Sequence, residues 1–173
     1  MRDLEGLASR GGTYQRALGH HSAYATSCGG AAHRHLPVSE RHIDIRWRDL
    51  DALGHVNQAV YHTYAEEVLD GWLRDRLGLA VGETWSYVTA RVAIDYRSEL
   101  RPADGHVVGT CHLASLGDSS VTVRIELRAP DGRLAAEVET VIVAWEGESR
   151  RSRPLAAGER RALQSTGRPA PGR

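Results

Sequence analysis

Hydrophobic and polar positions follow two different periods along the chain, and the change of period marks one long helix among strands. Over residues 42 to 47 the two kinds alternate one by one, which predicts a half-buried strand. A spacing of three and four residues follows and predicts a helix from about Gln58 to Leu77, with Asn57 as N-cap and Gly78 as C-cap. The apolar face of this helix is broad and consists of Val60, Tyr61, Tyr64, Ala65, Val68, Leu69, Trp72, Leu73 and Leu77.

The pattern after the helix is that of strands. Val88, Ala90, Val92, Ile94 and Tyr96 alternate with mainly polar residues, which predicts a strand with one apolar face. Two further strands, at about 106 to 116 and 120 to 129, flank a Gly-Asp turn and predict a hairpin. A Pro-Asp-Gly turn then leads into a last long strand at about 133 to 146. The predicted order is strand, long helix, four strands.

A helix with so broad an apolar face must bury it, and the concave face of the sheet is the only large apolar surface for it. The sequence therefore predicts an α+β hotdog fold, in which a curved five-stranded antiparallel sheet wraps around one long central helix. Because such a sheet keeps two edges, we expect two protomers to pair edge to edge, as a homodimer or within a homotetramer.

Composition divides the chain into three parts. Residues 1 to 38 are rich in Gly, Ala, Ser and His and predict a disordered extension. Residues 39 to 148 form the predicted hotdog domain. Residues 149 to 173 form an Arg-rich tail, with a short helix expected from Ala156 to Leu163 and a disordered end from Gly167.

Charge is unevenly spread, although the whole chain is neutral. Residues 39 to 148 carry 11 Arg against 19 Asp and Glu, whereas residues 149 to 173 carry 7 Arg against Glu159 alone. The basic tail could meet a phosphorylated ligand, or it could be a solvated end. Nucleic acid is not expected as a partner, because the acidic domain would repel a phosphate backbone.

Membrane and export segments are not visible in the pattern. No run approaches the roughly 18 apolar residues that span a bilayer, and the first 30 residues lack the apolar core of a signal peptide. Cys28 and Cys111 lie far apart without the spacing of a zinc site. We therefore expect a cytoplasmic protein with no membrane partner, no metal and no disulfide framework.

The polar residues between the first strand and the helix are the candidates for chemistry. A helix N-terminus presents free N–H groups and the positive end of the macrodipole, both of which suit a developing oxyanion. Gly54 would let the backbone turn close to a ligand, which the Asp51 carboxylate could face. The alternative is that Asp49, Asp51 and Asn57 only cap and turn the loop.

The same segment resembles the hotdog acyl-CoA thioesterases of the 4-hydroxybenzoyl-CoA thioesterase type, which carry a D-x-D-x-x-G-H-V-N signature. The resemblance covers residues 40 to 147. It rests on Trp47, Asp49, Asp51, Gly54, His55, Val56, Asn57 and Tyr61, and on Glu66-Glu67, Tyr96-Arg97 and Pro102. Gln58 departs from the pattern, since family members often have Asn there, and this could alter the polar wall of the site.

The resemblance implies an enzyme that hydrolyses an acyl-CoA, or an acyl-carrier-protein thioester, to the free acid without a cofactor. Asp51 would be the catalytic carboxylate, either as general base to a water or as nucleophile. Asn57 could orient the water or cap the helix, and His55 could line the site or hydrogen-bond within the loop. Asp49 is more readily interpreted as part of the loop structure.

Substrate binding is expected at the start of the helix. Backbone N–H groups around Gln58 and Ala59 would polarise the thioester carbonyl. Tyr61 is a candidate for the wall of the substrate site, although aromatic residues at helical spacing more often fill a core.

Two other interpretations use the same fold. An acyl-thioester dehydratase or hydratase would need a catalytic His that works with an acid on a helix, and His55 alone gives this little support. A non-catalytic acyl-CoA-binding module would keep the fold without turnover, and the presence of Asp51 argues against it.

Overall fold

The computed structural model describes residues 40–165 of the chain. Strand β1 (Arg41–Asp44) and the short 3-10 helix η1 (Trp47–Asp49) precede the long helix α1 (Gln58–Leu77). The chain continues through β2 (Tyr87–Tyr96), a 3-10 turn η2 (Pro102–Asp104), β3 (His106–Leu116), β4 (Ser120–Arg128) and β5 (Leu134–Glu146), and then through β6 (Arg151–Ser152) and α2 (Ala157–Gln164).

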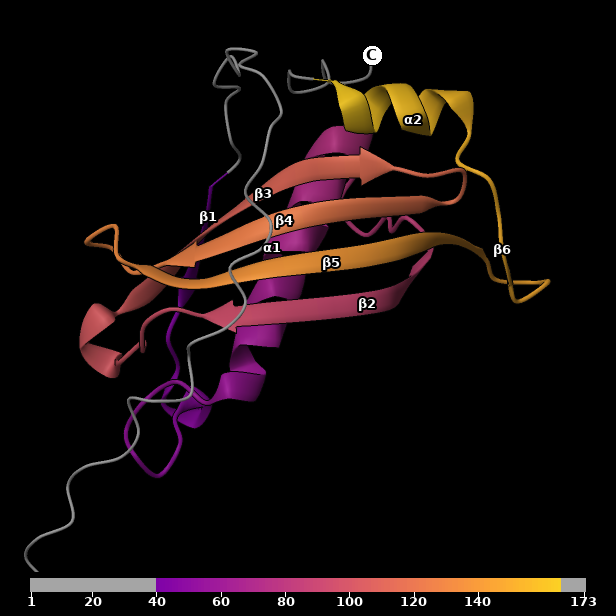
Figure 1. Cartoon of the computed structure of the whole chain (residues 1–173). Helices are drawn as coiled ribbons and strands as arrows, with labels where there is room; N and C mark the ends of the chain where they lie inside the picture. The colour runs from indigo at the N-terminus through magenta and orange to yellow at the C-terminus, as the bar shows by residue number, and fades with distance from the viewer. Residues whose placement is uncertain (1–39, 166–173) are drawn as a thin grey trace, which may run out of the picture. The chain divides into compact units, whose positions relative to one another are not determined.

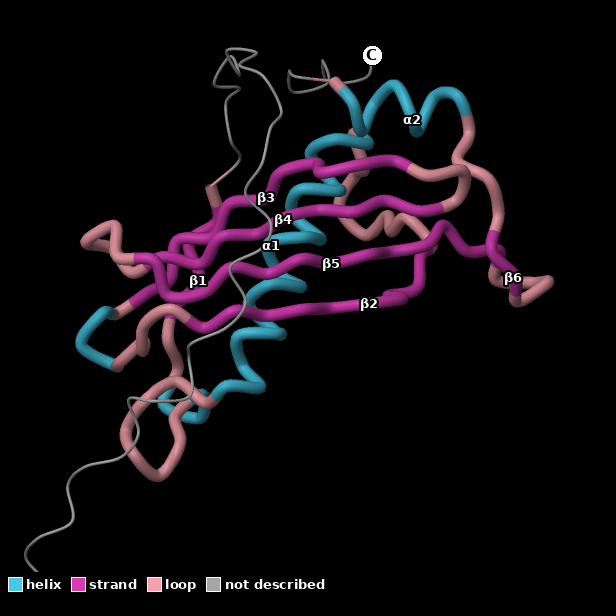
Figure 2. The backbone as a smooth tube through the Cα atoms, in the orientation of Figure 1, coloured by secondary structure: helices cyan, strands magenta, loops and turns pink. Residues whose placement is uncertain are grey.

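The strands form one antiparallel sheet, and α1 crosses one of its faces. The strand order is β1-β3-β4-β5-β2, and the two-residue β6 pairs with the end of β5. Figure 1 shows α1 running behind β3, β4, β5 and β2, and Figure 2 follows the same path of the backbone. This is the predicted α+β hotdog fold, with a curled five-stranded path around one helix and one additional short strand.

Helix α1 begins and ends where its capping residues predict. The Asn57 side chain accepts a hydrogen bond from the Ala59 N–H at 2.9 Å, and Gly78 closes the helix with a left-handed φ of 66°. Seven of the nine predicted apolar positions are buried, and Val60 and Leu77 are half-buried. The helix lies so close to β3 that a Cβ at Gly109 would stand 2.2 Å from the Val68 side chain.

The first strand is shorter than predicted. It ends at Asp44 instead of Trp47, because the Asp49 carboxylate accepts the Arg46 N–H at 2.9 Å and turns the chain into η1. Trp47 consequently lies in η1 with 89% of its surface exposed. The alternating pattern alone did not reveal this turn.

The apolar face predicted for β2 is interrupted by a bulge. The pairing with β5 shifts between Thr89 and Arg91, so that Thr89 and Val92 lie opposite the buried Ile142 and Thr140. Val88 lies opposite the half-buried Val143 and therefore shares the other face of the sheet. The prediction that Val88 belongs to the same face as Val92 is wrong for this reason.

The segment after β5 packs onto the domain. Helix α2 contacts α1 and β3, and Leu155 and Leu163 are buried in the core. The helix expected from 156 to 163 is therefore present as α2. The predicted extension at 1 to 38 and the end from Gly167 lie outside the described residues.

Candidate active site

Asp51 opens a tight turn, formed by residues 51–55, between η1 and α1. Its Oδ1 accepts the N–H groups of Leu53 at 2.8 Å and His55 at 3.1 Å. Its main-chain N–H donates to the His55 carbonyl at 2.8 Å, and Gly54 has a φ of 76° that this closure requires. Within residues 40–165, Oδ2 has no hydrogen-bond partner. One oxygen thus anchors the half-buried carboxylate while the other remains open.

Asp49 has a different environment, although it lies only two residues earlier. It is 5% exposed, and its Oδ2 accepts the Tyr64 hydroxyl at 2.8 Å and the Arg46 N–H at 2.9 Å. Burial and this hydrogen bond raise the pKa of Tyr64, so the hydroxyl stays a donor. Asp49 joins η1 to α1, which agrees with the interpretation as loop structure.

His55 faces a residue that the sequence analysis did not single out. Its Nε2 lies 2.9 Å from Oε2 of Glu99, in the segment that connects β2 to β3. Its main-chain groups hold Asp51, as described above. His55 therefore links the Asp51 turn to the β2–β3 connection, while about a third of its side chain stays exposed.

The start of α1 leaves one backbone donor open. The Asn57 N–H donates to the Asp49 carbonyl at 2.8 Å, and the Val60 N–H to the Asn57 carbonyl at 2.9 Å. The Ala59 N–H is used by the Asn57 side chain. Among these first residues only the Gln58 N–H has no partner within the described part of the chain, so it is the one free to meet a ligand.

Tyr61 is a buried link between α1 and the β2–β3 connection. It is 3% exposed, and its hydroxyl accepts the Leu100 N–H at 3.0 Å. Burial raises the pKa of this hydroxyl. Its ring meets Tyr96 edge to face at 5.3 Å between centroids, and Tyr96 donates its hydroxyl to the Gln58 carbonyl at 3.1 Å. Tyr61 thus lies beneath the start of α1.

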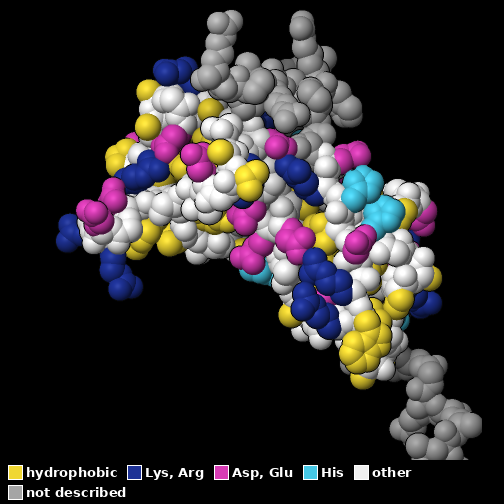
Figure 3. Space-filling view, turned by 180° about the vertical axis from the view of Figure 1, so that it is seen from behind, with side chains coloured by type: hydrophobic (Ala, Val, Ile, Leu, Met, Phe, Trp, Pro, Cys, Tyr) yellow, Lys and Arg dark blue, Asp and Glu magenta, His cyan; other side chains and the backbone are white. Residues whose placement is uncertain are grey.

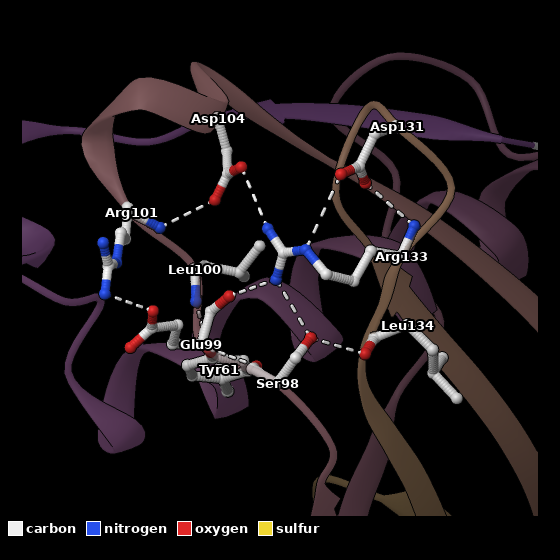
Figure 4. A network of polar contacts seen from close by, with 9 residues as sticks. All are labelled: Tyr61, Ser98, Glu99, Leu100, Arg101, Asp104, Asp131, Arg133 and Leu134. Atoms are coloured by element: carbon white, nitrogen blue, oxygen red, sulfur yellow. Dashed lines mark hydrogen bonds and ion pairs between the residues drawn. The ribbon is translucent and has the colours of Figure 1, made fainter.

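The β2–β3 connection is held by Arg133, the residue just before β5 (Figure 4). The Arg133 guanidinium donates to the Ser98 hydroxyl at 3.0 Å and to the Glu99 carbonyl, and it pairs with Asp104 at 3.0 Å. The Ser98 hydroxyl in turn donates to the Leu134 carbonyl at 2.7 Å. One side chain therefore ties both ends of the connection to the sheet.

A small, shallow recess that is open to solvent lies between α1 and the strands β2 and β5. His62, Ala65, Glu66 and Leu69 line it from the helix, and Thr89, Val92 and Thr140 from the sheet. His62 comes four residues after Gln58, so the two side chains share one face of α1. The recess mixes small, apolar and polar side chains.

Acidic side chains dominate the exposed side of the helix. Glu66, Glu67 and Asp70 are exposed on α1. Figure 3, which views the molecule from the helix side, shows acidic side chains on this face with Arg side chains among them. Over residues 40–165 no three His, Cys, Asp or Glu side chains come together in a way that could hold a metal ion.

A family model of the thioesterase-like superfamily matches residues 45–163, which include the Asp51 turn, α1 and α2. The chain belongs to the thioesterase-like superfamily. No curated protein sequence matches it.

Solved structures place the chain among thioesterase-like proteins of the same fold. It is similar to a thioesterase from Thermus thermophilus crystallised with coenzyme A and zinc, at 31% identity and a TM-score of 0.65, over 76% of this chain and all of that one. A Pseudomonas aeruginosa protein is 26% identical with a TM-score of 0.66, over 78% and 99% of the two chains. A 1,4-dihydroxy-2-naphthoyl-CoA thioesterase from Synechocystis shares the fold at 17% identity and a TM-score of 0.62, over 73% and 95%.

Within this superfamily member, the predicted site residues fall into two groups. One group lies along a continuous stretch, the turn and the helix start, and consists of Asp51, His55, Asn57, Gln58 and Ala59. Tyr61 lies in the core beneath them. No helix within residues 40–165 is long and apolar enough to cross a bilayer.

Proposed function

We propose that this protein is an acyl-CoA thioesterase with Asp51 as its catalytic carboxylate. The observation that carries the proposal is the asymmetric environment of Asp51: two N–H groups fix Oδ1, and Oδ2 is left open. A carboxylate with one fixed and one open oxygen is oriented without being neutralised. Membership of the superfamily and the relative crystallised with coenzyme A support the substrate class.

Asp51 can act in either of two ways. As general base, Oδ2 takes a proton from a water whose oxygen attacks the thioester carbonyl. As nucleophile, Oδ2 attacks that carbonyl itself, and water then hydrolyses the mixed anhydride. In both routes the C–S bond breaks, the acyl group leaves as the free acid and coenzyme A leaves as the thiol.

The Gln58 N–H is the proposed oxyanion donor. It belongs to the first turn of α1, where the helix macrodipole is positive, and it has no partner among residues 40–165. The Ala59 N–H is a weaker candidate, because the Asn57 side chain already accepts it. Asn57 accordingly acts by shaping the helix start.

The acyl group is proposed to run from Gln58 along α1 into the recess. Ala65 lies seven residues further on, which is roughly 10 Å along a helix axis. Thr89 and Thr140 line the opposite wall. An acyl chain in this position would lie between α1 on one side and the sheet on the other.

A homodimer is proposed to complete the enzyme. Strand β2 is ten residues long and is paired only with β5 within the described residues, so its other edge can pair with a second copy. The recess lies beside this strand, and a second protomer there would help to close it. A cytoplasmic location stays a prediction.

The dehydratase interpretation receives no comparable support. It needs an acid on a helix beside its His, whereas Glu99, the partner of His55, lies in the β2–β3 connection. A non-catalytic module would differ from the enzyme in binding acyl-CoA esters without hydrolysing them.

Thiol release from a panel of acyl-CoA esters tests the proposal. We expect the wild type to hydrolyse at least one ester, and Asp51→Asn and Asp51→Ala to lose most of that rate while staying folded. Asp118→Asn, which changes an exposed acid in the β3–β4 turn, is the matched control and should keep the rate. A folded wild type that binds these esters without hydrolysing any would favour the binding module. Full activity of both Asp51 variants would remove Asp51 from the mechanism.

A further inference from the structure

The Asp51 turn is tethered to the β2–β3 connection by two contacts of different kinds. One is a main-chain bond, from the Val56 N–H to the Leu100 carbonyl at 2.8 Å. The other is the side-chain contact of 2.9 Å between His55 Nε2 and Glu99. The first fixes where the turn lies, and the second fixes the residue whose main chain holds Asp51.

Glu99 is itself held from three sides. Its other carboxylate oxygen pairs with the Arg101 guanidinium, and its carbonyl accepts a hydrogen bond from Arg133. The next residue, Leu100, is fixed by the Tyr61 hydroxyl. Figure 4 shows Glu99 between Arg101 and Arg133, with Tyr61 alongside.

We propose that Glu99 is a positioning residue for Asp51 and that it acts through His55. Glu99 holds the imidazole, and His55 in turn offers its N–H to Asp51 Oδ1 and its carbonyl to the Asp51 N–H. The orientation of Oδ2 toward a substrate thus depends on a carboxylate that does not touch the reacting atoms. This inference rests on the proposed thioesterase function.

Loss of Glu99 should impair the chemistry more than the fold. The main-chain bond from Val56 to Leu100 does not involve the Glu99 side chain and still joins the turn to the connection when that side chain is removed. Moreover, 43% of that side chain is exposed, and exposed ion pairs contribute little to stability. A displaced carboxylate, by contrast, can lower a rate by about 100-fold for a shift of about 1 Å.

The kinetic test uses the ester that the wild type hydrolyses best. We expect Glu99→Ala to lower kcat by about 10- to 100-fold, with KM within about twofold of wild type and an unchanged melting temperature. Glu99→Gln keeps an oxygen that can accept the His55 Nε2–H and should recover most of kcat. Glu126→Ala, which removes a comparable half-exposed pair with Arg128, is the control and should match the wild type.

A double-mutant cycle tests whether the effect passes through His55. If Glu99 acts through the imidazole, then Glu99→Ala combined with His55→Ala should be no slower than the slower single variant. If the fold losses of kcat in the two single variants multiply in the double variant, the proposal is overturned, because Glu99 would then act independently of His55. An unchanged kcat in Glu99→Ala would overturn it as well.

Amide hydrogen exchange gives a readout that does not need activity. The Leu53 and His55 amides, which donate to Asp51, should exchange faster in Glu99→Ala than in wild type or Glu126→Ala. If the wild type hydrolyses no ester, the proposed thioesterase function fails. The exchange rates alone then test whether Glu99 positions Asp51. Unaltered exchange at both amides would overturn the positioning role in either case.

Discussion

Two acids in one short segment have different roles because their surroundings differ. Asp49 is buried and its carboxylate accepts a hydroxyl and an N–H, whereas Asp51 is half-buried with one open oxygen. A buried charge without partners costs several kcal/mol, so Asp49 has to keep its donors. Tyr64 is therefore expected to matter for stability, and Asp51 for the chemistry.

Removal of the Tyr64 hydroxyl tests the structural role of Asp49. We expect Tyr64→Phe to lower the free energy of unfolding by about 1 to 3 kcal/mol, because the Asp49 carboxylate loses a buried donor. Tyr87→Phe is a matched control, since Tyr87 donates to Asp70 at 2.6 Å at the surface, where water can replace it. Urea unfolding of both variants measures the difference. If both variants lose the same free energy of unfolding, the burial of Asp49 does not determine the loss in Tyr64→Phe.

Two glycines of the helix–sheet contact allow a second comparison. An added Cβ at Gly109 would meet the β-branched Val68 at 2.2 Å, whereas one at Gly71 would meet the end of the flexible Arg41 side chain. We expect Gly109→Ala to cost about 1 to 3 kcal/mol by overpacking. Gly71→Ala should be nearly neutral, because the gain in helix propensity of about 1 kcal/mol offsets the shift of Arg41. Thermal unfolding checks both, and a neutral Gly109→Ala would mean that α1 can move away from β3.

Among the elements, α2 has one carboxylate that joins its first turn to two other segments of the chain. Glu159 accepts the Trp85 indole N–H at 2.7 Å, pairs with Arg153 at 2.7 Å and accepts the Ala156 N–H at 2.7 Å. Arg153 also lies over the Trp85 ring, 5.9 Å from its centroid. The loop before β2, the segment after β6 and the start of α2 thus meet at this one residue.

This cluster makes the stability pH-dependent. The Arg153 hydrogen bond, with further N–H donors and against the cost of burial, lowers the pKa of Glu159 from 4.5 to about 2. The folded pKa lies below the unfolded one, so the contribution is complete above about pH 5 and is lost as the pH falls toward 2. We expect Glu159→Gln to lower the free energy of unfolding by about 2 kcal/mol at neutral pH, and by less as the pH falls below 4.5.

Urea unfolding at about pH 7 and about pH 3 measures this dependence. Glu126→Gln serves as control, because its pair with Arg128 lies on β4, away from α2. A wild-type-minus-variant difference that is the same at both pH values would contradict the role given to Glu159.

Secondary structure was predictable where one period and clear end signals coincide. Helix α1 has both, with Asn57 and Gly78 at its ends, and its predicted bounds are confirmed. β1 and β2 were predicted less well, because a side chain in η1 and a bulge at Thr89 interrupt the alternation. Such interruptions depend on contacts between distant segments, which a period does not contain.

The candidate site could be found from the sequence only along one stretch of chain. The signature from Asp49 to Asn57 is contiguous and marks the turn. Glu99 lies 44 residues after His55, and nothing in its local pattern distinguishes it from other exposed acids. The N–H groups of Gln58 and Ala59 were predicted together as donors, but the sequence did not distinguish them, because the Asn57 side chain uses only the Ala59 N–H.

At the scale of the whole molecule, β2 is the strand whose outer edge has no partner within residues 40–165. Its ten residues end the sheet, and both Val88 and Tyr96 are exposed, at 37% and 50%. Long edge strands are commonly covered, because their open N–H and C=O groups otherwise pair with other chains. A twofold pairing of β2 with a second β2 would cover both edges at once.

A charge on this edge should weaken the assembly. In a twofold interface each substitution occurs twice, so Val88→Asp would place two added charges in one contact, together with the native Asp95 of β2. We expect the wild type to sediment as a dimer or tetramer, and Val88→Asp to shift toward the monomer with a loss of thioesterase activity at low protein concentration. Val81→Asp changes a fully exposed valine outside the strand and should leave the oligomeric state and the thioesterase activity unchanged. A wild type that is monomeric at every concentration would remove the dimer, and an active monomer would show that one chain holds the whole site.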